Sequence, residues 1–297
     1  MATAALSLVL LLQAISADLT GVAQASVRPR ECAISRPTVW ERAREPRLRA
    51  YCDALARGFG KLSTAPEEAK AEAELAAELS KGRAAPYVLL GRAESAMGTH
   101  EAARLAFEKA RELDDRALDE PHALHAYAMA LFRSGRAEEA LAAYRALVPR
   151  IELLAGADRR VRVLLEAAEL AMALGPEHAD LALPWLRRAR REPLREAQPR
   201  VLAMLALALD RRGDAEQASV LLEEVRRLGG ARAVGAFSSR AVDTREALAV
   251  QALVEEAENR RKAAELWERY LAAKTAPHEE HARGRLERLT GKLRAAR

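Results

Sequence analysis

The sequence repeats itself at intervals of about 34 residues, and this self-similarity limits the fold more than any other feature. In its clearest copy, apolar or small residues recur three or four positions apart on both sides of one glycine. These residues are Leu202, Leu205, Ala206, Leu209, Gly213, Ala218, Leu222, Val225 and Leu228. The spacing predicts two amphipathic helices joined by a Gly-Asp turn. Ala and Leu favour helices, and aromatic residues make up only 4% of the chain, so an all-α fold of closely packed helices is expected.

Three further copies lie upstream in the same phase, with their turns at Gly98, Gly135 and Gly175. Two degenerate copies extend the array. One begins near Ala50 and has Thr64 in place of the turn glycine. The other begins at Thr244 and has Glu258 there. The predicted repeats cover residues 50–83, 84–117, 121–154, 161–196, 199–232 and 244–275.

The pattern resembles the tetratricopeptide repeat. The match is fullest from Ala84 to Asp115, where the motif positions are occupied by Leu90, Gly91, Gly98, Ala103, Phe107 and Ala110. Glu94 stands where the family usually has an aromatic residue, and Asp115 where it usually has proline. The resemblance implies an α-solenoid, a right-handed superhelix of antiparallel helical hairpins. No linker interrupts the array, so residues 39–296 are expected to form one continuous domain.

Three segments outside the repeats have separate predictions. Residues 26–38 are rich in Arg and Pro and are expected to be extended. Residues 229–242, rich in Gly, Ala and Ser, are expected to form a hinge or loop. Residues 277–296 have Ala282, Leu286 and Leu289 on one face, which predicts a helix that caps the end of the solenoid.

Residues 1–25 have the pattern of a signal peptide. An uncharged apolar run covers residues 4–15, and Ala23-Gln24-Ala25 offers the small residues that a signal peptidase needs before Ser26. An uncleaved anchor is the alternative, although the uncharged stretch is shorter than the ~20 residues of a bilayer span. We therefore expect export to the periplasm or cell envelope, with no membrane span after cleavage. Cys32 and Cys52 are the only cysteines. In an oxidising compartment they could form a disulfide worth roughly 3 kcal/mol, and two unrelated buried thiols are the alternative.

The charge pattern argues against nucleic-acid binding. The 48 basic and 43 acidic residues give a net charge of +5, but the two signs are interleaved, often within one helical turn. This arrangement leaves no long basic stripe for a phosphate backbone, and aromatic residues for stacking on single strands are scarce. The helices are therefore expected to carry mixed, solvated charge.

No catalytic or cofactor motif is recognisable, so we expect no enzymatic activity and no cofactor. The Gly58–Ser63 segment has a Gly-Lys pair but lacks the spacing of a phosphate-binding loop. His122 with His125, and His278 with His281, have the i, i+3 spacing that could place two metal ligands on one helix face. Neither pair has an evident third ligand, so solvated or groove-lining histidines are favoured and no metal site is predicted. Carboxylate pairs such as Glu255-Glu256 are expected on solvated faces.

The family resemblance implies that the first helix of each hairpin lines a concave groove that holds a partner peptide or helix. The implied groove residues are Arg92, His122, His125, Met129, Phe132, Arg133, Arg162, Leu165, Glu169, Met172, Arg200, Ala203, Leu207, Asp210 and Arg211. Arg beside Met, Phe and Leu suits a partner with carboxylates between apolar anchors. The Asn residues of the family's carboxylate clamp are absent, because the chain has only Asn259. A protein-binding scaffold is the predicted function, and a structural component that self-assembles is the alternative.

Overall fold

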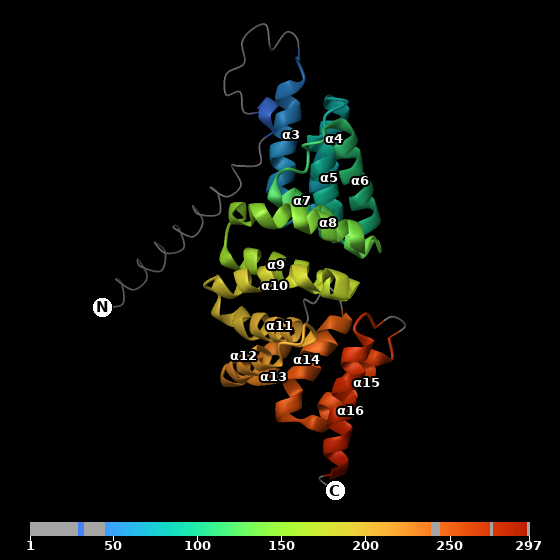
Figure 1. Ribbon diagram of the computed structural model, residues 1–297. Coiled ribbons are helices and arrows are strands. Elements are labelled where there is room, and N and C mark those ends of the chain that lie inside the picture. The colour runs from blue at the N-terminus through green and yellow to red at the C-terminus, as the bar shows by residue number, and fades with distance from the viewer. Residues whose placement is uncertain (1–28, 33–44, 239–243, 274–275, 296–297) are drawn as a thin grey trace, which may run out of the picture. The chain divides into compact units, whose positions relative to one another are not determined.

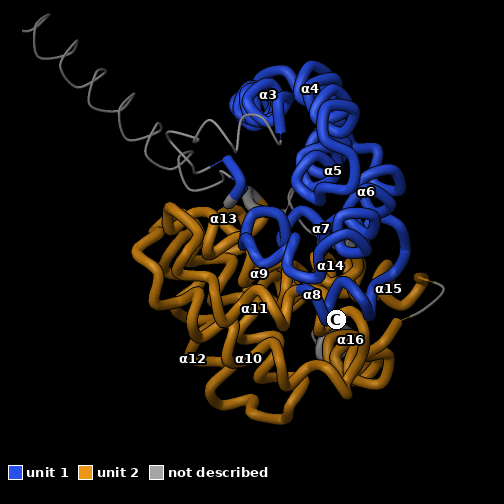
Figure 2. Tube along the Cα trace, turned by 90° about the horizontal axis from the view of Figure 1, so that it is seen from above, with its two compact units in different colours: residues 1–143 blue, residues 144–297 orange. Residues whose placement is uncertain are grey.

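The computed structural model describes residues 29–32, 45–238, 244–273 and 276–295, and every regular element within these ranges is a helix (Figure 1). The predicted all-α class, built from successive helical hairpins, is thereby confirmed. The chain divides into two compact units, residues 1–143 (unit 1) and 144–297 (unit 2), which Figure 2 shows in blue and orange. The continuity of the array over residues 39–296 stays a prediction. The signal-peptide prediction falls on residues outside the described ranges.

Unit 1 contains three hairpins. The first pairs α3 (Leu48–Lys61) with α4 (Pro66–Leu79), and the second pairs α5 (Ala85–Met97) with α6 (His100–Leu113). The third begins with α7 (Pro121–Arg133) and continues with α8 (Ala137–Leu147), which crosses the boundary between the units. The first helices of successive hairpins contact one another, α3 with α5 and α5 with α7. This is the layer that the family resemblance assigns to the groove.

Unit 2 continues with hairpins of the same kind. After the 3-10 helix η3 (Val148–Leu153), α9 (Ala157–Leu174) pairs with α10 (Pro176–Arg191), and a short turn, η4 (Arg195–Ala197), leads to α11. The next hairpin consists of α11 (Gln198–Arg211) and α12 (Ala215–Arg227). The last consists of α14 (Thr244–Glu258) and α15 (Arg260–Leu271), followed by α16 (Glu279–Ala295), which packs on α15. Again the first helices α9, α11 and α14 contact one another.

Turn glycines end the first helices of four hairpins, as the repeat predicts. Gly98, Gly135 and Gly213 have φ values between 79° and 91°, and Gly175 has a φ of 132°. L-residues rarely adopt positive φ, because their Cβ clashes with the backbone, whereas glycine does so without that cost. The glycine pattern in the sequence therefore marks the true reversals of the chain.

The predicted loop at residues 229–242 is wrong for its first part, since residues Gly230–Ser238 form helix α13. Gly229 and Gly230 both have positive φ and make the sharp turn after α12. A carboxylate from the end of α14, Glu258, accepts a hydrogen bond from the backbone N–H of Ala231 and so caps the new helix. Val234 is fully buried, and α13 contacts α11, α12 and α14. Residues 239–242 lie outside the described ranges.

The N-terminal segment also differs from its prediction where it is described. Residues Arg30–Cys32 form a short 3-10 helix, η2, rather than extended chain. Cys32 is joined to Cys52 of α3 by a disulfide, with 5.6 Å between the two Cα atoms. Tyr51 donates a hydrogen bond to Glu31 over 2.9 Å, so the disulfide and this bond both tie η2 to α3.

The departure from the family pattern at Glu94 has a local explanation. The side chain is buried in unit 1 and forms an ion pair with Lys70 of α4, with 2.9 Å between Nζ and Oε1. The Thr99 hydroxyl donates a second hydrogen bond to the same carboxylate. Burial by itself raises the pKa of Glu94, but the bonds from Thr99 and Lys70 outweigh it and lower the pKa below its usual value. An ion pair between two hairpins thus occupies the position where the family usually has a ring.

A substitution at Gly91 tests the packing of α5 on α6. A Cβ at this position would lie 2.9 Å from three ring atoms of Phe107, whose side chain is fully buried. We expect Gly91→Ala to lower the free energy of unfolding of unit 1 by about 1–3 kcal/mol, because the ring must move within a packed core. Urea denaturation followed by far-UV circular dichroism measures the change.

Gly60→Ala is the matched control in the same unit. Gly60 lies in α3, and a Cβ there would meet no heavy atom within 4 Å. Alanine should therefore raise stability by about 0.5–1 kcal/mol through the lower backbone entropy of the unfolded chain. Two changes of the same sign and size would contradict the close contact at Gly91.

Candidate functional site

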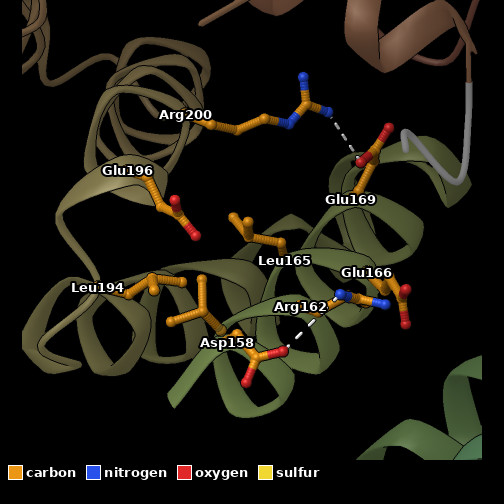
Figure 3. Close-up of a pocket in the computed structure, with 9 residues that line it drawn as sticks. Asp158, Arg162, Leu165, Glu166, Glu169, Leu194, Glu196 and Arg200 are labelled. Atoms are coloured by element: carbon orange, nitrogen blue, oxygen red, sulfur yellow. Dashed lines mark hydrogen bonds and ion pairs between the residues drawn. The ribbon is translucent and has the colours of Figure 1, made fainter. Parts of the chain in front are cut away.

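A cavity of about 50 Å³ lies in unit 2, between α9 and the segment that joins α10 to α11 (Figure 3). One face of α9 supplies most of its lining, because residues three or four apart on a helix point the same way. The connecting segment and the first turn of α11 supply the rest. The lining residues are Asp158, Val161, Arg162, Leu165, Glu166, Glu169, Leu194, Glu196 and Arg200.

A buried ion pair closes one side of this cavity. Arg200 Nη2 lies 3.1 Å from Glu169 Oε2, and both side chains are at most 4% exposed. The pair joins α9 to α11, the first helices of consecutive hairpins, as the dashed line in Figure 3 shows. A buried pair contributes little net stability, since desolvation offsets the attraction, but it holds both side chains in one arrangement. Beside it, the Tyr144 hydroxyl donates a hydrogen bond to Glu166 over 3.2 Å.

The opposite side of the cavity is more open to solvent. Arg162 lies 3.9 Å from Asp158, and both side chains are about half exposed or more. Glu196 is exposed, and in Figure 3 its carboxylate points toward Leu165 at the centre of the view. The apolar surface comes from Val161 and Leu165 on α9 and from Leu194 on the connecting segment.

The structure brings four of the predicted groove residues together at this cavity: Arg162, Leu165, Glu169 and Arg200. Sequence reasoning missed the other five lining residues. Leu194 and Glu196 lie between helices, where no periodic signal points to them, and Asp158, Val161 and Glu166 lie on α9 at positions that the resemblance does not assign to the groove. Six predicted groove residues lie in unit 1. All six are at least partly exposed on α5 and α7: Arg92, His122, His125, Met129, Phe132 and Arg133.

Two of the unit 1 residues meet at the start of α7. Glu120 caps this helix by accepting hydrogen bonds from the backbone N–H groups of His122 and Ala123. Arg92 Nη1 and His122 Nε2 lie 3.9 and 4.0 Å from its carboxylate oxygens. The Arg92 guanidinium also lies over the ring of Phe59, 5.6 Å from its centroid. These predicted groove residues are thus already engaged within unit 1.

The predicted groove role of Leu207 and Arg211 is wrong in this structure. Leu207 is fully buried, and the Arg211 side chain is only 2% exposed. Arg211 forms an ion pair with Glu246 of α14, with 2.6 Å between Nη1 and Oε2. The physical reason is that α13 and α14 pack on α11. Three further implied positions are also buried: Met172, Ala203 and Asp210.

A buried polar cluster forms where α16 meets α11. His281 Nε2 donates to Asp210 over 2.5 Å, and Arg285 donates to the same carboxylate over 3.0 Å. Arg285 also pairs with Glu256 of α14 over 2.9 Å. Burial alone raises the pKa of Asp210, but the bonds from His281 and Arg285 lower it below the usual value. The expectation that Glu255 and Glu256 lie on a solvated face was wrong, because their side chains are 5% and 17% exposed.

The second histidine of this region is also buried rather than solvated. His278 Nε2 donates a hydrogen bond over 2.9 Å to the backbone carbonyl of Met172 on α9. Its backbone N–H donates to the Tyr270 hydroxyl over 3.4 Å. Burial, together with the charge of Arg211, lowers the pKa of His278 to about 4. The pair at 278 and 281 is therefore structural, contrary to the solvated or groove-lining role expected from spacing.

Across the described ranges, no three His, Cys, Asp or Glu side chains are placed to hold a metal ion. Among the same residues, no helix combines the length and apolar character needed to cross a membrane. The residues around the cavity combine a small apolar surface with charged side chains held in place, an arrangement suited to binding a side chain of another molecule.

Comparisons with known proteins agree with the repeat. A family model described as tetratricopeptide repeat matches residues 84–116. No curated protein sequence matches significantly. PilF of Pseudomonas aeruginosa is a similar solved structure, 18% identical over 79% of this chain and 97% of its own, with a TM-score of 0.48.

Two other solved structures are similar in the same way. YrrB, a TPR protein with an unusual peptide-binding site, is 20% identical over 71% of this chain and 95% of its own, with a TM-score of 0.43. Cut9, from the APC/C hetero-tetramer Cut9–Hcn1, is 16% identical over 80% of this chain and 52% of its own, with a TM-score of 0.37. The family match falls on the repeat whose residues carry the motif most fully, and the chain is a helical-repeat protein with a tetratricopeptide repeat at residues 84–116.

Proposed function

We propose that the protein is a non-catalytic scaffold of the periplasm or cell envelope, which binds an extended segment of a partner protein across α9 and α11. One observation carries the proposal. Four residues that the family resemblance assigns to the groove surround a single cavity on the first helices of two consecutive hairpins. Tetratricopeptide proteins are typically interaction scaffolds, and this cavity is where such an interaction would be centred.

The size of the cavity indicates what kind of ligand it serves. Sites for small molecules usually enclose roughly 300–1,000 Å³, whereas this cavity has about 50 Å³. A cavity of this size accommodates no more than one side chain of a partner. A bound partner must therefore gain most of its contacts from the helix surfaces beside the cavity, which favours a protein segment over a free metabolite.

The compartment is part of the proposal. The apolar run at residues 4–15 with Ala23-Gln24-Ala25, and the disulfide between Cys32 and Cys52, support export, because disulfides persist in oxidising compartments. An alkaline-phosphatase fusion after Arg297 should be active in cells, since that enzyme matures only outside the cytoplasm. An inactive fusion of full length would overturn the compartment.

Photo-crosslinking tests the binding surface in cells. With p-benzoylphenylalanine in place of Arg162 at the cavity, we expect a defined crosslinked partner by mass spectrometry. The matched control carries the same residue in place of Arg227, which is 74% exposed on α12. Equal crosslinking at both positions would contradict a groove site.

Self-assembly or bracing of an envelope complex through the α12 side is the second candidate. Val220 and Leu228 of the α12 region are 64% and 47% exposed, which is unusual for large apolar side chains on a solvated helix. Crosslinks from position 227 to a second copy would favour this function, and so would light scattering that shows oligomers at micromolar concentration. A monomer throughout that range would count against it.

A further inference from the structure

The charges that line the cavity do not balance. The lining has four carboxylates and two guanidinium groups, a net charge of −2. The guanidinium groups are engaged, Arg162 with Asp158 and Arg200 with Glu169. Of the two remaining carboxylates, Glu166 lies inside the protein and Glu196 faces solvent. Glu166 is buried and accepts the bond from Tyr144, whereas Glu196 is exposed and has no ion-pair partner within the described part of the chain. The site therefore favours a cation near Glu196.

The neutral surface of the cavity suits a long aliphatic stem. Leu165 and Leu194 face one another across it (Figure 3), and Val161 also lines it. A lysine side chain combines the two features that the cavity favours, an aliphatic stem and a cation. Its methylene stem packs on apolar surface while its ammonium reaches a carboxylate. The ammonium is compact, whereas the planar guanidinium of arginine is larger and needs several acceptors in one plane. The volume of about 50 Å³ favours the smaller head group.

We propose that the cavity is a recognition pocket for one lysine of the partner segment, with the lysine stem between Leu165 and Leu194 and its ammonium at Glu196. This inference rests on the proposed function and specifies its partner. It replaces the expectation of a carboxylate-bearing partner at this position, because the two Arg side chains that suggested carboxylates are neutralised within unit 2.

Methyl NMR of the full-length protein tests the assignment at the site itself. The probes are degenerate peptide mixtures that differ only at one central residue, which is lysine, norleucine, arginine or glutamate. Norleucine keeps the aliphatic stem and removes the charge. We expect the lysine mixture to shift the methyl signals of Leu165 and Leu194. At low salt its affinity should be about fivefold higher than that of the norleucine mixture, which is the contribution expected of one solvent-exposed ion pair.

Glu196→Gln should reduce the lysine-to-norleucine ratio to about one, because it removes the charge but keeps the shape. Glu216→Gln is the matched control, since Glu216 is exposed on α12 in the same unit and outside the cavity. This variant should keep the wild-type ratio. The methyl signals also report whether each variant is folded.

Three results would overturn the lysine assignment. The first is that the lysine mixture causes no shift of the methyl signals up to roughly 1 mM. The second is that the norleucine or arginine mixture binds as tightly as the lysine mixture. The third is that Glu196→Gln keeps the preference for lysine over norleucine. The crosslinking experiment decides the proposed function separately. A partner crosslinked at position 162 without lysine preference would retain the groove and reject the lysine pocket.

Discussion

Arg211→Met is expected to lower the free energy of unfolding of unit 2 by about 3–5 kcal/mol, because it leaves the Glu246 carboxylate buried without its guanidinium partner. The two side chains are 2% and 1% exposed, and 2.6 Å separates Nη1 from Oε2. Arg211 also donates to Glu246 through Nη2 over 3.2 Å and to the Tyr270 hydroxyl over 3.4 Å. One residue of α11 thereby holds α14 and α15, and its loss should affect all three helices. Urea denaturation followed by far-UV circular dichroism measures the change.

Arg226→Met is the matched control on the neighbouring helix α12. Arg226 pairs with Glu223 over 2.8 Å, but these side chains are 59% and 40% exposed. Exposed pairs contribute little, so this variant should change stability by less than about 0.5 kcal/mol. The double variant Arg211→Met, Glu246→Leu should recover most of the loss, because an apolar pair needs no desolvation. A loss below about 1 kcal/mol for Arg211→Met alone would contradict the buried position of the pair.

The hairpins could be predicted from the sequence because their causes are local. Apolar spacing of three and four residues defines each buried face, and a glycine such as Gly213 permits the reversal between helices. The same reasoning failed at residues 230–238, where a glycine-rich composition hid a helix whose cap, Glu258, comes from another element. A contact from a distant helix leaves no trace in the local pattern.

The candidate site divides in the same way. Arg162, Leu165 and Glu169 could be predicted together, since they share one face of α9. Leu207 and Arg211 have the same helical spacing on α11, yet they are buried in the structure, where α14 packs on α11. The pairing of Asp210 with Arg285 spans 75 positions in the chain. An arginine at a given spacing looks the same in the sequence whether it faces solvent or a buried carboxylate, so only the packing of α14 and α16 distinguishes these cases.

The second large effect concerns pH. In the folded chain the pKa of His278 is about 4, against 6.5 for an ordinary histidine, because burial and the Arg211 charge disfavour the imidazolium. Between these two values the unfolded chain binds a proton that the folded chain does not. The stability of unit 2 is therefore full above pH 6.5 and falls as the pH drops toward 4. For these pKa values the loss between pH 7 and pH 5 is about 2 kcal/mol.

His278→Gln should remove most of this slope. Glutamine can still donate to the Met172 carbonyl, but it does not titrate. The third tryptophan of the chain, Trp40, belongs to unit 1 and is replaced by Phe in every variant of this series. Urea denaturation at a series of pH values, followed by the fluorescence of Trp185 and Trp267, then measures the stability of unit 2, to which both of these tryptophans belong. His125→Gln is the control, because His125 lies on α7 in unit 1 and should leave the slope of unit 2 unchanged.

The pH window separates His278 from the carboxylates of the same region. Asp210 has a folded pKa below its ordinary value of 3.8, so the stability that it contributes is lost only as the pH falls below about 4 to 5. A slope between pH 7 and pH 5 thus reports protonation of the imidazole rather than of Asp210. If His278→Gln keeps the full slope, the imidazole is not held neutral against α9, and the contact between residue 278 and Met172 does not form in solution. If the slope disappears in His278→Gln, the segment before α16 packs on α9 as the structure shows. The surface of unit 2 that is available to a partner is then confined to the cavity between α9 and the segment that joins α10 to α11.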